Sequence, residues 1–170
     1  MTNGQLPGQG IVFWPVGTGD GTTIVIDNRH VVQVDIHDMV SADEEGAVVT
    51  AVVDRLVESL PKGVDGRPYL TAFVLTHADK DHVLGFRDLL KRVTIGEIWA
   101  TPRLWREQAE AEGGLCPDAE AFHQEAARRV AAVRKAVAAG REPASGDRIR
   151  VIGYDVAQED YEYSGFRPST

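Results

Sequence analysis

One apolar run that ends abruptly in polar residues constrains the fold of this chain more than any other feature of its sequence. The run Tyr69–Leu75 has the length of a single β-strand and is apolar at most positions, as expected for a strand that is buried on both faces of a sheet. Thr76–His82 is polar, and Val83–Leu90 then returns to the apolar spacing of a helix. The polar segment therefore lies at a strand-to-helix junction, which predicts an α/β fold.

Apolar spacing in the rest of the chain predicts the elements around this strand. Thr22–Ile26 and His30–Ile36 are β-branched runs on either side of a short polar turn, and we expect them to pair as antiparallel strands. An amphipathic helix should follow, because Ser41–Glu44 has capping-box spacing and Pro61 ends the apolar stripe beyond it. The remaining expected elements are strands at Gly10–Trp14, Glu97–Ala100 and Arg148–Tyr154, and a helix from Pro117 to Ala139 whose apolar stripe runs from Phe122 to Val137.

Length, charge and cysteine content limit the class of protein. At 170 residues the chain suits one domain. Its net charge of -8 argues against a surface that coats nucleic acid, although a bound divalent cation would give an acidic protein a local positive potential. The single Cys116 cannot form an internal disulfide, so we expect a cytoplasmic protein in which His and carboxylates hold any metal. The sequence has no signal-peptide pattern and no run of about 18 apolar residues, so no membrane partner is expected.

Four side chains of metal-binding type lie within the polar segment, namely His77, Asp79, Asp81 and His82. They follow the carboxyl end of a buried strand, which is where open α/β sheets place their sites. On an extended loop, positions 77 and 79 point the same way and could share one cation, while Asp81 and His82 could turn towards a second. Two cations about 3.5–4 Å apart can hold a bridging water as hydroxide and stabilise the oxyanion that forms when it attacks an ester.

The segment Leu75-Thr-His-Ala-Asp-Lys-Asp-His-Val-Leu-Gly85 resembles the H-x-H-x-D-H signature of the metallo-β-lactamase superfamily. With Asp79 in place of the middle His, it is similar to the competence-type branch, whose signature is H-x-D-x-D-H. In that branch a strand opening of the form F-x-x-V-G-x-G-D precedes the signature, and Phe13–Asp20 resembles it. Val32–Ile36 resembles the family strand that ends in an Asp, but the family glycine is missing after Asp35.

The resemblance implies the N-terminal half of a metallo-β-lactamase-type αββα sandwich, with a mixed sheet flanked by helices. Residues 1–170 would form a single domain that is incomplete at its C-terminus, because the family's remaining ligands come from later sequence. His123 is the only His after position 82, and it falls inside a predicted helix. By resemblance His77 and Asp79 would hold a first metal and Asp81 and His82 a second, and Asp81 would also be catalytic, accepting a proton from the metal-bound water.

The implied cofactor is Zn²⁺, with two ions in a complete site. Asp79 makes the ligand set harder and more anionic than a histidine would, which raises the chance of Mn²⁺ or Fe. The implied activity is a metal-dependent hydrolase that uses a metal-bound hydroxide. Because the competence-type branch is associated with nucleic-acid processing, we expect a phosphodiester substrate, either a nucleotide or a nucleic acid, as for a phosphodiesterase or nuclease.

Two other functions are consistent with the same residues. The chain could be a truncated, non-catalytic module that binds a complementary chain or forms a homo-oligomer, in which case it would be inactive as an isolated fragment. It could also be an oxidoreductase resembling the flavodiiron proteins, which carry a carboxylate at the second signature position, although as Glu.

Simpler structural roles remain open for several of these residues. Asp79 and Asp81 precede an apolar helical run and could cap that helix. The glycine-rich segment Gly17–Gly21 is expected to form a tight turn, since it lacks the Lys-Ser/Thr of a phosphate loop. His30 and His37 are expected at the surface, although His37-Asp38 follows the strand whose end approaches the metals in the family. The basic residues Arg128, Arg129, Arg134 and Lys135 are expected on a solvated helix face or in contact with phosphates.

Overall fold

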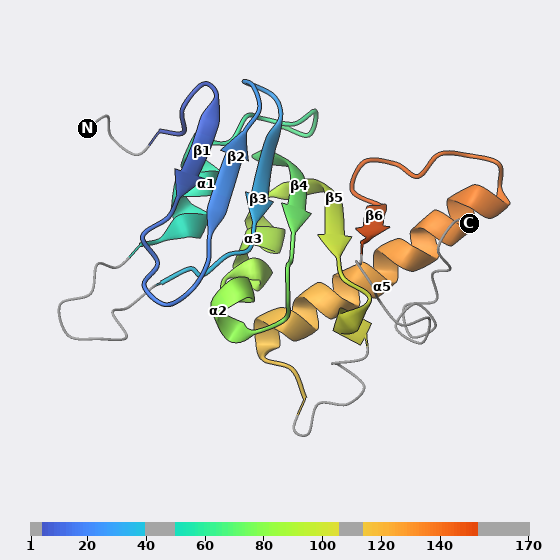
Figure 1. Ribbon diagram of the computed structural model, residues 1–170. Coiled ribbons are helices and arrows are strands. Elements are labelled where there is room, and N and C mark those ends of the chain that lie inside the picture. Colours follow the sequence, from blue (N-terminus) through green and yellow to red (C-terminus); the bar gives the residue numbers. More distant parts are fainter. Residues whose placement is uncertain (1–4, 40–49, 106–113, 153–170) are drawn as a thin grey trace.

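A six-stranded mixed β-sheet forms the centre of the computed structural model, which describes residues 5–39, 50–105 and 114–152 (Figure 1). The second strand is antiparallel to both the first and the third, and the third to sixth strands are parallel. The α/β prediction is thereby confirmed. The strands follow one another across the sheet in chain order: β1 (Gly10–Phe13), β2 (Thr22–Val25), β3 (Val31–Val34), β4 (Tyr69–Val74), β5 (Thr94–Ala100) and β6 (Arg148–Val151).

The helices lie on one face of this sheet. Parallel strands in chain order are joined by right-handed crossovers, and such crossovers place every connecting helix on the same side. Figure 1 shows α1 and α3 behind the sheet and α5 crossing beneath β5 and β6. Among the helices that the structure describes, none is long and apolar enough to cross a membrane. The described helices are α1 (Val52–Ser59), α2 (Lys80–Val83), α3 (Phe86–Arg92) and α5 (Pro117–Ala138).

An aromatic cluster joins the sheet to its helices. The ring of Phe73 on β4 lies 4.9 Å from that of Phe86 on α3 and 5.8 Å from that of Phe122 on α5, measured between centroids. All three residues are fully buried. Each aromatic side chain removes a large apolar area from water, so this cluster makes a major contribution to the core.

Alternate rows of the sheet face opposite sides. The row that includes Phe73 faces the helices and is mostly buried; its other members are Val12, Thr23, Gln33, Ile98 and Ile149. The next row lies on the opposite, open face and comprises Phe13, Thr22, Val34, Val74, Trp99 and Arg150. Phe13 is 76% exposed there, and Ile11 beside it on β1 is also exposed. The open face therefore presents apolar side chains that the described residues do not cover.

The amphipathic helix expected before Pro61 is α1 in the described part of the chain. It starts at Val52. The Val53 amide donates a hydrogen bond of 2.9 Å to Asp38 Oδ1, so a carboxylate just beyond β3 caps this helix. The capping box predicted at Ser41–Glu44 lies outside the described residues and stays a prediction.

The helical run predicted at Val83–Leu90 is also interrupted. It divides into α2 and α3 at Leu84 and Gly85. Gly85 has a φ of 100° and its Cα faces Asp38, where an added Cβ would lie 2.4 Å from the Asp38 Cβ. A left-handed backbone and a close approach both require glycine at this position.

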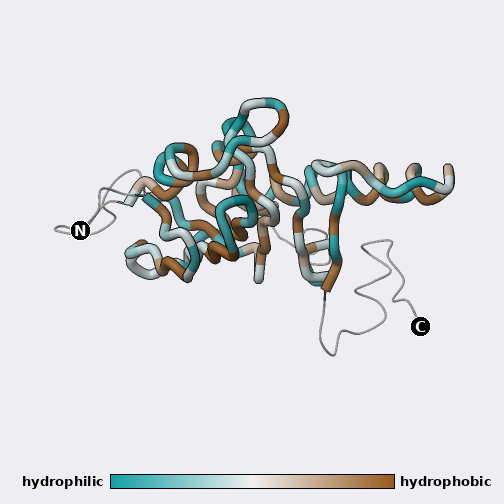
Figure 2. The backbone as a smooth tube through the Cα atoms, turned by 90° about the horizontal axis from the view of Figure 1, so that it is seen from above, coloured by the Kyte–Doolittle hydropathy of each residue, from teal (hydrophilic) through white to brown (hydrophobic). Residues whose placement is uncertain are grey.

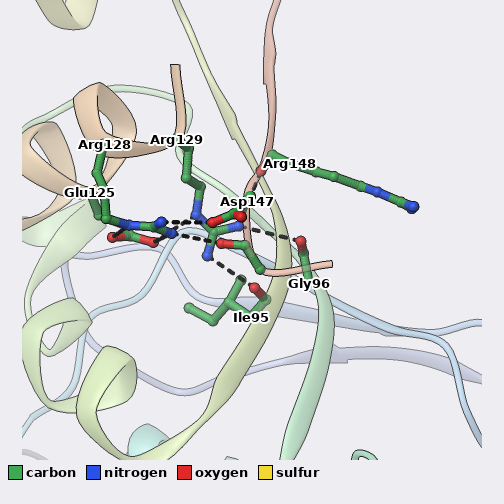
Figure 3. A network of polar contacts seen from close by, with 8 residues as sticks. Ile95, Gly96, Glu125, Arg128, Arg129, Asp147 and Arg148 are labelled. Atoms are coloured by element: carbon green, nitrogen blue, oxygen red, sulfur yellow. Dashed lines mark hydrogen bonds and ion pairs between the residues drawn. The ribbon is translucent and has the colours of Figure 1, made fainter. Parts of the chain in front are cut away.

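Arg129 is buried, so the predicted solvated face of α5 is wrong at this residue. It is only 2% exposed, and its guanidinium donates to Glu125 at 2.7 Å, to the Ile95 carbonyl at 2.9 Å and to the Arg148 carbonyl at 3.1 Å (Figure 3). Burial lowers the pKa of the Arg129 guanidinium, and its hydrogen bond to Glu125 opposes that effect. The side chain ties α5 to both β5 and β6.

The C-terminal end of α5 does not pack as its apolar stripe predicts. Val137, expected in that stripe, is 65% exposed. Figure 2 shows this end of the helix and the loop that follows it projecting beyond the body of the molecule. The stripe is buried only where the sheet lies beside it, at Phe122, Ala126 and Val130.

Replacing Arg129 by Ala is expected to lower the free energy of unfolding by about 3 kcal/mol, because it leaves buried carbonyl groups and Glu125 without a donor. Arg55→Ala is the matched control: this arginine forms an exposed 3.7 Å ion pair with Glu58, and its loss should change stability by less than about 1 kcal/mol. Urea denaturation of the three proteins measures both values. Equal stabilities of the two variants would contradict the structural role of Arg129.

Candidate metal centre

The candidate site forms where the carboxyl ends of β3 and β4 meet. Asp35 directly follows β3, and its backbone amide donates to the Val74 carbonyl at 2.9 Å, so the parallel pairing continues past the end of the strand. The polar segment leaves β4 at the same edge and turns into α2. Because carboxyl ends of parallel strands share one edge, residues more than 40 positions apart are brought side by side.

The structure brings the four predicted ligands together as two pairs. His77 Nε2 lies 3.4 Å from Asp79 Oδ2, and His82 Nε2 lies 3.8 Å from Asp81 Oδ2. The two imidazole rings are themselves adjacent, with centroids 3.6 Å apart. Ligand atoms that each lie about 2 Å from one cation can be at most about 4 Å apart, and both pairs meet that limit.

Asp79 does not act as a helix cap. It occupies the position just before α2, but its side chain makes no capping hydrogen bond. The carboxylate is instead exposed beside His77. The capping alternative raised by the sequence therefore fails for Asp79, and its carboxylate is available to a ligand.

Asp35 holds the ring of His82. Its side chain is 4% exposed, and its Oδ2 accepts hydrogen bonds from His82 Nδ1 at 2.9 Å and from the Thr76 hydroxyl at 2.6 Å. The Thr76 backbone amide donates to the other oxygen, Oδ1, at 2.8 Å. A carboxylate that accepts the Nδ1 proton fixes the tautomer of His82 and leaves Nε2 as the free ligand atom, on the side of Asp81.

The backbone at Asp35 is unusual. Its φ of 50° makes it the one non-glycine residue with a positive φ among those the structure describes. Such a left-handed conformation costs about 1–2 kcal/mol in an L-residue, and Asp tolerates it better than most. The following amide, that of Ile36, donates to the His82 carbonyl at 2.8 Å, so this turn also fixes the backbone of α2.

The glycine-rich loop between β1 and β2 contributes Asp20. Its backbone amide donates to the Asp81 carbonyl at 3.1 Å, and its carboxylate Oδ2 lies 3.8 Å from His82 Nδ1. Gly19 permits this approach, because a Cβ there would lie 2.0 Å from His37 Nδ1 and 2.5 Å from the Asp81 carbonyl. The tight turn expected at Gly17–Gly21 thus packs directly against the polar segment.

Among the described residues, the group of three potential ligands whose atoms all lie within 4.8 Å of one another is Asp20, Asp35 and His82. Of the four predicted ligands only His82 belongs to it, and His77, Asp79 and Asp81 do not. A cation held by these three would have to break the 2.9 Å hydrogen bond between Asp35 and His82. The pairs formed by His77 with Asp79 and by Asp81 with His82 require no such change. Asp35 therefore positions the His82 ring, and metal binding by His77, Asp79, Asp81 and His82 stays a prediction from the sequence.

His37 is buried rather than at the surface, contrary to the sequence expectation. It is among the buried polar residues, and its Nδ1 has no hydrogen-bond partner among the described residues. The ring packs against Gly19. Its neighbour Asp38 is also buried and serves as the cap of α1. Both residues therefore support the loops around the site.

The other two described histidines lie elsewhere. His30 is exposed and hydrogen-bonded to Asp27 at 2.9 Å, as expected for a residue in a surface hairpin. His123 lies within α5, where its ring is 6.2 Å from that of Trp105 and burial lowers its pKa. Both are imidazoles outside the candidate site and serve as controls for it.

No protein-family model, curated protein sequence or solved structure matches the chain. The chemistry of the site therefore has to be inferred from its own residues.

The charge of Asp38 is expected to make stability depend on pH. Burial raises the pKa of its carboxyl above the usual value, with Asp54 and Asp88 adding to the rise and the amides of Val52 and Val53 opposing it. The folded protein then binds more protons than the unfolded one, so unfolding free energy falls as pH rises through the folded pKa.

The test compares the wild type with Asp38→Asn, which keeps an oxygen to accept from Val53. The difference in unfolding free energy should favour the wild type more at acidic pH and shrink as the pH rises towards neutrality. Urea denaturation over a pH series measures this difference. A constant difference over the whole range would contradict a raised pKa at Asp38.

Proposed function

We propose that this chain carries the metal centre of a metal-dependent hydrolase. The observation that supports the proposal most strongly is the adjacency of the two ligand pairs, His77 with Asp79 and Asp81 with His82, at one sheet edge. A buried carboxylate behind His82 adds to it, because metal-binding histidines usually donate their second ring proton to such a group.

The donor set agrees with a divalent transition metal. It offers two imidazoles and two carboxylates, which suits Zn²⁺ and also Mn²⁺ or Fe. When bound, such a cation supplies Lewis-acid activation of water and stabilises an oxyanion that develops during attack on an ester. His77, Asp79, Asp81 and His82 would hold the metal.

The chain's own residues would then divide the remaining work. Asp35 orients His82, and Asp20 adds an exposed carboxylate beside the His82 ring. Asp81 is half-exposed, so its second oxygen can accept a proton from the attacking water. A general base must reach the proton that it removes, and Asp81 is the carboxylate of the set that lies beside His82.

The substrate class is proposed from the resemblance to the competence-type metallo-β-lactamase branch. It suggests a phosphodiester of a nucleotide or nucleic acid. The chain has a net charge of -8, so attraction of a phosphodiester depends on the bound cation and not on the protein surface.

The proposed fold family is the metallo-β-lactamase sandwich, with this sheet as one of its two layers. Helices on one face and an apolar open face on the other are what one layer of an αββα sandwich requires, because the open face would pack against a second sheet. Ile11 and Phe13 would lie in that inner layer.

Metal content tests the proposed function. The wild type, purified and dialysed with Zn²⁺ or Mn²⁺, should retain metal, and His77→Ala/His82→Ala should lose nearly all of it, because each proposed pair loses its imidazole. His30→Ala/His123→Ala is the matched control, since it also removes two imidazoles but leaves the site intact. Elemental analysis gives the metal content of each protein.

Equal low metal content in the wild type and in the site variant would remove the hydrolase proposal. The same samples are assayed on a chromogenic phosphodiester, where Asp81→Ala should lower the hydrolysis rate at least about 100-fold. Retained metal without any hydrolysis by the wild type would favour a non-catalytic function instead.

A second candidate function is a non-catalytic module that binds through the open sheet face. The observation that favours it is the exposure of three large apolar side chains at the β1–β2 end of that face: Ile11, Phe13 and Ile26. Contiguous exposed apolar surface commonly marks an interface. The occupant we propose is the same face of a second copy of the chain, so that two sheets pack against each other.

Under this second candidate the purified chain should dimerise with increasing concentration, and Phe13→Ser should weaken the dimer at least about 10-fold through loss of buried apolar area. Val64→Ser is the matched control, since Val64 is fully exposed on a loop. Sedimentation equilibrium measures both. A monomer at all concentrations would exclude the homodimer.

A further inference from the structure

Two polar side chains occupy the middle of the buried face of the sheet. Thr23 and Gln33 are both 0% exposed, and they pair across β2 and β3 in the row that faces the helices. Their neighbours in this row are apolar, with Phe73 next to Gln33 on β4. A buried amide needs hydrogen-bond partners to offset its loss of water, so the partners of Gln33 show what its position does.

The partners form a chain that ends at the candidate site. Trp14 Nε1 donates to the Thr23 hydroxyl at 2.8 Å, and that hydroxyl donates to Gln33 Oε1 at 2.5 Å. Gln33 Nε2 then donates to the backbone carbonyl of Asp35 at 2.7 Å. The Thr23 hydroxyl thus fixes which end of the Gln33 amide faces Asp35.

The Asp35 carbonyl belongs to the peptide group that follows the left-handed residue. This residue has the left-handed φ of 50°, and its side chain accepts from Thr76 and His82. A hydrogen bond to its carbonyl fixes the peptide plane that follows this strained residue. The same peptide plane carries the Ile36 amide, which donates to the His82 carbonyl at 2.8 Å. Rotation of the plane would break that hydrogen bond and let the His82 backbone, and with it the ring, move away from the Asp35 carboxylate.

We propose that Gln33, held in place by Thr23, is a positioning residue for the candidate metal centre. It fixes the left-handed turn at Asp35, and through Asp35 it holds the His82 ring with Nδ1 protonated and Nε2 free for a cation. This inference rests on the proposed function for its metal-binding consequence, but the state of the His82 ring can be measured without metal.

Packing alone does not account for this pair. Replacing both partners of a buried hydrogen bond with apolar groups of the same shape is often nearly neutral for stability. Valine at 23 and methionine at 33 would fill the same space in an otherwise apolar row. The polar pair is therefore best explained by the direction that it gives to the Asp35 peptide.

The test uses Gln33→Met and Thr23→Val, which remove the hydrogen bonds and keep the volume, and Thr23→Ser, which keeps the hydroxyl. Leu70→Ala is the control for general destabilisation, because Leu70 is fully buried on β4 and is not one of the hydrogen-bonded residues from Trp14 to Asp35. Two quantities are measured on each protein: the imidazole tautomer of His82 and the affinity for Co²⁺.

The tautomer is read from the ¹⁵N shifts of the metal-free protein at a pH well above the usual histidine value of about 6.5. We expect the wild type and Thr23→Ser to hold the Nδ1-protonated form. Gln33→Met and Thr23→Val should show a mixture of the two tautomers. Their Co²⁺ affinity should fall roughly 10-fold, with altered visible absorption of the bound ion, while Leu70→Ala should match the wild type in both.

Each other outcome decides a separate question. If the apolar variants keep the Nδ1 tautomer and the Co²⁺ affinity of the wild type, or if Leu70→Ala loses them equally, the positioning role of Gln33 is overturned. It is also overturned if both apolar variants fail to fold while Leu70→Ala folds. If the tautomers change as expected but the wild type binds no Co²⁺, Gln33 still positions His82 and the metal proposal fails.

Discussion

The hydrogen bond between Asp35 and His82 is the interaction on which the geometry of the candidate site depends. It joins the end of β3 to the helix that follows β4, across 47 positions of sequence. Because the Asp35 carboxylate also accepts two hydrogen bonds from Thr76, one buried side chain fixes both the start of the polar segment and its last imidazole. Such a carboxylate gives a metal-binding histidine its tautomer and its direction.

The rest of the fold keeps that bond in place. Parallel pairing of β3 with β4 sets the distance between the two strand ends. At the end of β3 the left-handed Asp35 places its carboxylate within hydrogen-bond distance of Thr76 and His82. Gly19 lets the first loop lie against the Asp81 backbone. Near the opposite edge of the sheet, hydrogen bonds from Arg129 join α5 to β5 and β6. The site thus rests on a scaffold whose polar contacts are nearly all satisfied among the described residues.

Local patterns made most of the secondary structure and the four proposed ligands predictable from the sequence. His77 to His82 lie within one short segment, so their proximity follows from chain connectivity, and strands such as Tyr69–Val74 have a continuous apolar signal. Asp20, Asp35 and Gln33 could not be assigned roles in the same way, because their partners are distant in sequence. The burial of Arg129 was missed because an arginine among acidic neighbours suits a solvated face equally well. The division between α2 and α3 depends on a tertiary contact of Gly85 with Asp38.

The order of the strands has a consequence for how the chain folds. Adjacent strands of the sheet are neighbours in sequence, but a long crossover connection closes each parallel pair, and such non-local pairings form slowly. Domains begin to fold from the N-terminus while they are being synthesised. Asp20, Asp35 and the segment up to His82 all precede α5 and β6 in sequence, so the strand pairings that bring these side chains together do not depend on the synthesis of those later elements.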